Sequence, residues 1–153
     1  MSYPMSIHMV QHLMLGLIIP ALFVFAAASK LKILWLPLPT TVSWLLGVGT
    51  MLAWHLPGHR FHLIQPWIFL ITGTIFWWPI LGPPARRISP LAAVCYLFSA
   101  CLSCTVMGAY LTFTAAGNPD QQLAGLLMWV PGCFIYLSAI LVTVKRWYSE
   151  TAA

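Results

Sequence analysis

Long apolar stretches alternate with short polar connections along the whole chain. Five of these stretches cover residues 7–28, 41–57, 63–82, 90–115 and 123–144. A helix needs about 20 mainly apolar residues to cross a hydrocarbon core of about 30 Å, and only the second stretch is clearly short of this length. Pro20 predicts a kink in the first stretch, because a proline inside a helix removes one backbone hydrogen bond. We find no internal repeat and no boundary that would divide residues 1–153 into two domains.

Composition supports a membrane protein over a water-soluble one. Hydrophobic residues make up 61% of the 153 residues and charged residues only 6%, and the mean hydropathy is +0.89. Soluble domains carry about 25% charged residues. In lipid, every backbone polar group has to be satisfied within helices or a closed barrel. The sequence therefore predicts an all-α fold, an integral membrane bundle of about five transmembrane helices that forms a single domain.

The basic residues predict the orientation of this bundle. With five spans, six of the seven Lys and Arg side chains fall on one side of the membrane, and only Arg60 falls on the other. Cytoplasmic loops carry the excess of Lys and Arg, so we expect the N-terminus outside and the C-terminal tail inside. Because no basic face remains outside the membrane, we expect no nucleic-acid partner. The six side chains on the cytoplasmic side are Lys30, Lys32, Arg86, Arg87, Lys145 and Arg146.

All five histidines fall on the predicted outer side. His8 and His12 are four residues apart at the outer end of the first helix, so they share a helix face and can offer two ring nitrogens to one ion. Imidazole together with nearby methionine thioether suits copper, and zinc also accepts imidazole, whereas the scarcity of carboxylates disfavours magnesium and calcium. The alternative is that these histidines cap helix ends at the aqueous boundary. The remaining three are His55, His59 and His62.

The four cysteines all lie inside apolar stretches, which disfavours an extracellular disulfide framework. Cys101 and Cys104 form a C-x-x-C pattern. We interpret this pair as small packing residues, because cysteine behaves as a small hydrophobe in apolar surroundings.

Four motifs in order along the chain resemble the polytopic CtaG-like family of cytochrome c oxidase assembly factors. They are HMVQH at residues 8–12, AWHLP at 53–57, FWWPILGP at 76–83 and DQQLAGLLMWVPG at 120–132. The resemblance implies a multi-pass protein of the bacterial plasma membrane that helps to mature a haem-copper oxidase by handling copper on the outer side. The family's recurring histidine positions are matched at His8, His12 and His55.

The chain also departs from the family pattern. It begins close to the first motif, so we expect a shortened member. Where the family tends to show H-x-x-E/Q-H, His62 and Gln65 match, but Pro66 replaces the second histidine. A site that used this imidazole is then one ligand short, and either His59 substitutes for it or metal affinity is lost.

These observations predict an assembly factor, not an enzyme, whose partners are oxidase subunits and the lipid bilayer. One alternative is a structural accessory subunit of an oxidase or supercomplex without metal, and another is a b-type cytochrome with haem held by His12 and His55. Asp120 is expected either to accept an imidazole N–H or to act as a helix N-terminal acid. The predicted copper ligands are His8, His12, His55 and His62, with Met9, His59 and Asp120 as auxiliary residues.

Overall fold

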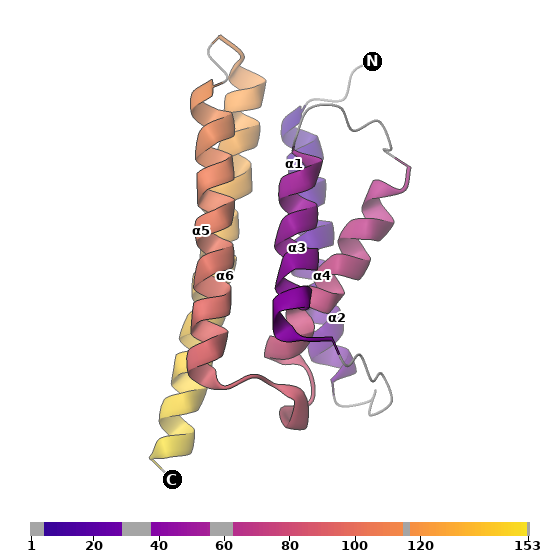
Figure 1. Cartoon of the computed structure of the whole chain (residues 1–153). Coiled ribbons are helices and arrows are strands. Elements are labelled where there is room, and N and C mark those ends of the chain that lie inside the picture. The colour runs from indigo at the N-terminus through magenta and orange to yellow at the C-terminus, as the bar shows by residue number, and fades with distance from the viewer. Residues whose placement is uncertain (1–4, 29–37, 56–62, 115–116, 153) are drawn as a thin grey trace. The chain divides into compact units, whose positions relative to one another are not determined.

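The computed structural model describes residues 5–28, 38–55, 63–114 and 117–152, and these residues form helices and no strands (Figure 1). This confirms the predicted all-α class. A π-helical turn, η1, separates α1 from α2, and a short 3₁₀ turn, η2, follows α4. The elements are α1 (Met5–Leu13), η1 (Met14–Ile18), α2 (Ile19–Ala27), α3 (Thr40–Trp54), α4 (Gln65–Leu81), η2 (Pro84–Arg86), α5 (Pro90–Thr114) and α6 (Pro119–Thr151).

Each of the five apolar stretches corresponds to a helical segment. Among the described residues, three helices are long and apolar enough to cross a membrane, and they span Met5–Ala27, Pro90–Thr114 and Pro119–Thr151. The helix over Thr40–Trp54 is apolar but shorter, and α4 has 17 residues. The length and composition of these three helices support a membrane protein, while the crossing by all five segments stays a prediction.

The described residues divide into two compact units. The first contains residues 1–11 and 89–153, and the second contains residues 12–88, so the boundary runs through α1 between Gln11 and His12. Within the first unit, α5 packs along α6. Gly108 and Gly125 allow this close approach, because a Cβ at Gly108 would lie 2.6 Å from the Trp129 Cβ, and one at Gly125 would lie 2.8 Å from the Gly108 carbonyl oxygen.

Thiols occupy the same seam between α5 and α6. Cys101 and Cys104 are both buried. The Cys101 Sγ lies 3.3 Å from the Cys133 Sγ on α6, and the Cys104 Sγ lies 3.5 Å from the Met128 carbonyl oxygen. Both members of the C-x-x-C pattern therefore face the neighbouring helix and fill its packing surface.

In the second unit, η1, α2 and α3 pack on α4. Pro20 lacks the N–H that would bond to the carbonyl of Gly16, four residues earlier. That carbonyl lies against Gly73 of α4, at a position where a Cβ would clash with it. The sequence predicts a kink at Pro20. The structure has a π-helical turn, Met14–Ile18, just before this proline, and the Ile19 N–H bonds to the Met14 carbonyl there.

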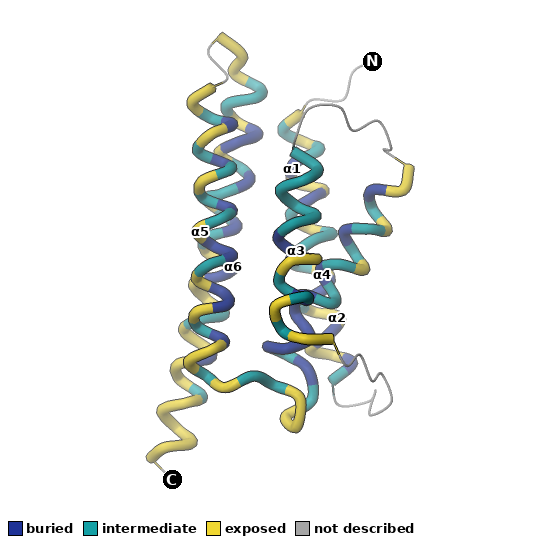
Figure 2. Tube along the Cα trace, in the orientation of Figure 1, coloured by how far each residue is buried: buried dark blue, intermediate teal, exposed yellow. Residues whose placement is uncertain are grey.

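Buried positions line the faces by which neighbouring helices pack, and the opposite faces are exposed (Figure 2). Large apolar side chains on these outer faces are open, including Phe113 at 81% and Phe25 at 71% exposure. Exposed aromatic side chains of this size along long apolar helices are what lipid covers in a membrane protein.

Candidate functional site

Two histidines from different helices meet inside the second unit. His12 lies on α1, and His55 is the residue that ends α3. Their ring centroids are 5.4 Å apart, and the rings stand nearly perpendicular, at 80°. The structure thus brings together two of the predicted ligands that are 43 positions apart in the sequence.

The start of α4 completes the surroundings of this pair. Gln65, the first residue of α4, is only 3% exposed, and its amide nitrogen hydrogen-bonds to the His12 Nε2. Phe69, one turn further along α4, lies with its ring centroid 4.5 Å from that of His12. His12 itself is 8% exposed, so its side chain is buried within the protein.

Hydrogen bonds determine which ring nitrogen carries the proton in each imidazole. The His55 Nδ1 lies 2.6 Å from the Met51 carbonyl oxygen one turn earlier in α3, and a carbonyl only accepts, so Nδ1 is the protonated nitrogen. In the neutral ring the lone pair is then on His55 Nε2. The Gln65 amide N–H donates to His12 Nε2, which places the His12 lone pair on Nε2 as well. Neutral imidazole with an oriented lone pair is the form that binds metal ions.

The other predicted ligands have different positions. His8 is half-buried one turn before His12 in α1, and Met9 is 3% exposed on the same helix. Both belong to the first unit. His59 and His62 lie outside the described residues. Within the described ranges, no three His, Cys, Asp or Glu side chains gather closely enough to enclose a metal ion.

Asp120 binds the start of α1. Its carboxylate accepts hydrogen bonds from the Met5 N–H at 2.6 Å, the Ser6 N–H at 3.3 Å and the Ser6 hydroxyl at 2.7 Å. The first N–H groups of a helix have no partner within the helix, and a negative charge there is favourable. Asp120 itself lies in the first turn of α6. These contacts fit the predicted role of Asp120 as an acid at a helix N-terminus. In addition to its place in the first turn of α6, Asp120 accepts the hydrogen bonds from the start of α1.

A family model described as the cytochrome c oxidase caa3 assembly factor (Caa3_CtaG) matches residues 1–150. The chain belongs to this family. The match confirms the resemblance predicted from the four motifs, and it establishes this protein as a cytochrome c oxidase assembly factor at the level of its family. No curated protein and no solved structure matches the chain.

In this assembly factor, sequence reasoning missed the contact between Gln65 and His12. Gln65 entered only as one matched position of a family motif. A signal was present, because a glutamine that opens a long apolar helix in LIQPWIFL is buried only when its amide is hydrogen-bonded. Its partner could not be identified from sequence, since that requires the packing of α1 against α4.

Proposed function

We propose that this assembly factor matures a haem-copper oxidase in the bacterial plasma membrane by holding copper(I) at the outer face. We take His12 and His55 as the central pair of ligands, while His8, His62 and Met9 stay predictions from the sequence. The observation that carries this proposal is the approach of the His12 and His55 rings to 5.4 Å inside one compact unit.

The chemistry of the pair suits a soft, low-coordinate ion. Imidazole nitrogens bind metals at about 2.0–2.1 Å, so one ion bridges two nitrogens that are roughly 4 Å apart. A distance of 5.4 Å between the two ring centroids is compatible with this separation between one nitrogen of each ring. No carboxylate lies between His12 and Ile88 in the sequence, which disfavours the hard cations that require oxygen ligands.

Gln65 gives the pair a way to release its ion. The Gln65 amide bonds to the nitrogen of His12 that an ion would use. Binding of copper replaces this hydrogen bond, and departure of copper restores it, so His12 keeps a partner in both states. A site of this kind is suited to transfer, because a buried polar nitrogen without any partner would oppose release.

The haem alternative fits the same geometry less well. Axial histidines have to hold a porphyrin between them. Here the two rings are in T-shaped contact, and Phe69 and Gln65 pack directly on His12. The metal-free accessory subunit is favoured by the lack of a three-ligand cluster among the described residues, and a copper measurement decides between it and the copper proposal.

The experiment measures copper bound to the purified full chain after loading with copper(I), together with the metal content of the oxidase that matures in the same cells. We expect His55→Ala to lower copper binding by at least about 10-fold, since even changes to residues that only orient a ligand cost 10–100-fold. The oxidase should then accumulate with haem and less copper.

Two methionines on the same helical stretch provide a matched control. Met9 is 3% exposed and Met14 is 39% exposed. We expect Met9→Leu to weaken copper binding modestly and Met14→Leu to leave it unchanged. Equal copper in the wild type and in His55→Ala would refute the copper proposal, and the accessory-subunit function would replace it.

The outer location of the pair has its own test. Ser149 is exposed near the end of α6, and the predicted orientation puts it in the cytoplasm. In a variant without the four native cysteines, Ser149→Cys should react with a membrane-impermeant maleimide only after the cells are opened. Reaction in intact cells would put the histidine pair on the cytoplasmic side and contradict the proposed direction of copper handling.

A further inference from the structure

Two thiols in contact lie halfway along the helices of the first unit. The Cys101 thiol of α5 donates to the Cys133 Sγ of α6 at 3.3 Å. At a rise of about 1.5 Å per residue, Cys101 lies about 17 Å from one end of α5 and about 20 Å from the other. Both helices are long and apolar enough to cross a hydrocarbon core of about 30 Å. When they cross, the two thiols lie near the middle of the hydrocarbon.

The backbones around these thiols approach as closely as a disulfide requires. α5 and α6 run side by side and antiparallel (Figure 1). Two turns from the thiols, a Cβ added at Gly125 would lie 2.8 Å from the Gly108 carbonyl oxygen. The Cα atoms of a disulfide lie within about 7 Å of each other, and its sulfurs are about 2.0 Å apart. The 3.3 Å between the Cys101 and Cys133 sulfurs is therefore compatible with formation of this bond.

The two thiols differ in their access to lipid. Cys101 is 8% exposed, whereas Cys133 is half-buried. On α6, Val130 and Leu137 lie one turn before and one turn after Cys133, and they are 36% and 47% exposed. Lipid covers apolar side chains of this kind on a membrane helix. The Cys133 thiol therefore borders the lipid, and the Cys101 thiol lies deeper in the seam.

The Thr105 hydroxyl orients both S–H groups. It donates to the Cys101 carbonyl oxygen at 2.9 Å. Because a hydroxyl has a single hydrogen, its oxygen accepts the hydrogen bond from the Cys133 thiol at 3.1 Å. The Cys133 sulfur in turn accepts from the Cys101 thiol. The two thiols and Thr105 thus form one continuous chain of hydrogen bonds.

The depth of these thiols determines which oxidant can reach them. Charged and water-soluble oxidants are excluded from hydrocarbon, because the transfer of a charge into apolar surroundings is costly. Quinones dissolve in the bilayer, accept two electrons together with two protons, and drive disulfide formation in bacteria. Both the dithiol and the disulfide are uncharged, so neither state is penalised in apolar surroundings, whereas a pair of thiolates holding a metal ion would be.

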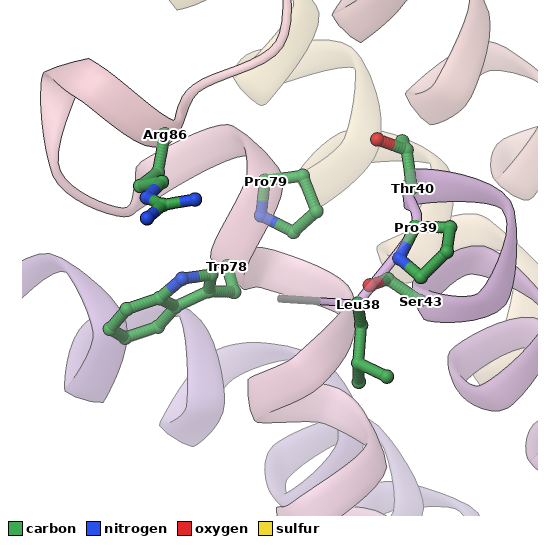
Figure 3. Close-up of a pocket in the computed structure, with 7 residues that line it drawn as sticks. All are labelled: Leu38, Pro39, Thr40, Ser43, Trp78, Pro79 and Arg86. Atoms are coloured by element: carbon green, nitrogen blue, oxygen red, sulfur yellow. The ribbon is translucent and has the colours of Figure 1, made fainter. Parts of the chain in front are cut away.

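This approach through lipid requires no cavity in the protein. A pocket of about 320 Å³ lies in the second unit, at the start of α3, and no cysteine lines it (Figure 3). That pocket therefore has no part in thiol chemistry, and a quinone meets the Cys133 thiol directly from the bilayer.

We propose that Cys101 and Cys133 are a redox-active thiol pair that a lipid-soluble quinone oxidises to a disulfide. The S–S bond forms as the two S–H bonds break. Both electrons and both protons pass to the two carbonyl oxygens of the quinone, which leaves as hydroquinone. The disulfide joins α5 to α6, so the first unit responds to the redox state of the membrane quinones. This activity does not depend on copper handling, and Cys104 keeps its interpretation as a packing residue.

The test places the reduced full chain in lipid nanodiscs and adds duroquinone, whose ring has no free position for addition of a thiol. Absorbance follows the hydroquinone, and peptide mass spectrometry locates the disulfide. We expect one equivalent of hydroquinone per chain and a bond between Cys101 and Cys133. Cys101→Ser and Cys133→Ser should each lower hydroquinone formation to the level of nanodiscs without protein. If either serine variant does not fold, the alanine variant replaces it.

Cys104→Ser is the matched control, because Cys104 lies one turn from Cys101 and its thiol donates to the Met128 carbonyl oxygen at 3.5 Å. We expect this variant to reduce duroquinone like the wild type. Thr105→Val should slow the reaction, since it removes the acceptor for the Cys133 proton, and Thr105→Ser should restore it. Ferricyanide, which is charged, should oxidise the pair far more slowly than duroquinone does.

Three results would overturn the proposal. Equal losses in Cys104→Ser and Cys133→Ser would mean that the reactive pair is a different one. Oxidation by ferricyanide as fast as by duroquinone would mean that the acceptor does not have to be lipid-soluble. Thiols that stay reduced in excess duroquinone would limit Cys101 and Cys133 to packing.

Discussion

Replacement of His12 affects both the stability of the second unit and its proposed copper site, and the structure separates the two effects. His12→Ala removes the imidazole that accepts the hydrogen bond of the buried Gln65 amide. Loss of a partner for a buried polar group costs about 1–3 kcal/mol. Loss of the ring contact between His12 and Phe69 adds about 0.5–1.5 kcal/mol. We therefore expect His12→Ala to lower the free energy of unfolding by about 1.5–4.5 kcal/mol.

The double variant His12→Ala, Gln65→Leu removes both members of this hydrogen bond. Replacing both partners by apolar groups is close to neutral, because no polar group is then left in apolar surroundings. We expect the double variant to be more stable than His12→Ala alone by about 1–3 kcal/mol. Its copper binding should nevertheless stay as low as that of His12→Ala, since the ligand nitrogen is absent from both.

The assay follows unfolding of the purified variants in mixed micelles and measures bound copper on the same preparations. Equal stability of His12→Ala and the double variant would refute the hydrogen bond between His12 and Gln65. Wild-type copper content in a well-folded double variant would refute His12 as a ligand. Recovered stability with copper still lost is the result that supports both parts of the reasoning.

Two further predictions concern the first unit. Asp120→Ala should lower the melting temperature, because three hydrogen bonds to the start of α1 are lost, whereas Glu150→Gln in the exposed last turn of α6 should leave it unchanged. With a protease site inserted between α5 and α6, mild oxidation should join the two fragments through Cys101 and Cys133, whose Sγ atoms are 3.3 Å apart. Fragments joined in a variant that lacks Cys133, or joined equally well through Cys104, would contradict this pairing.

The sequence predicted the position of each helix, because a long apolar stretch favours a membrane helix, but it did not predict every end: α6 runs to Thr151, beyond the predicted end at residue 144. The α5 helix (Pro90–Thr114) agrees with the predicted stretch 90–115 to within one residue. Pro20 was expected to kink its helix, and the structure has a π-helical turn just before it, whose Gly16 carbonyl lies against Gly73 of a different helix. Local sequence contains no information about such a neighbour.

The candidate site shows the same limit more clearly. The i, i+4 spacing of His8 and His12 was correctly interpreted as one helix face, but spacing alone treats the two residues alike. The structure distinguishes them, because His12 is buried against Phe69 and Gln65, whereas His8 is half-buried. Similarly, the C-x-x-C pattern pairs Cys101 with Cys104 in the sequence, whereas the thiol in contact with Cys101 is that of Cys133 on α6. Contacts between helices that are distant in sequence decided both outcomes.

The burial of His12 also bears on how a copper-transfer site would work. When an exposed imidazole loses its ion, water takes the place of the ion. Because water is available in excess, it favours neither the copper-bound nor the copper-free state. A buried imidazole has no water nearby, so its empty state is stable only when a protein group binds the ligand nitrogen. Gln65 is that group here. The free energy of copper binding is then reduced by the hydrogen bond that copper displaces, and the strength of this single bond tunes how readily the site gives its ion to the oxidase. Under the proposed function, Gln65→Leu without a change at His12 should bind copper more tightly than the wild type and deliver it to the oxidase more slowly.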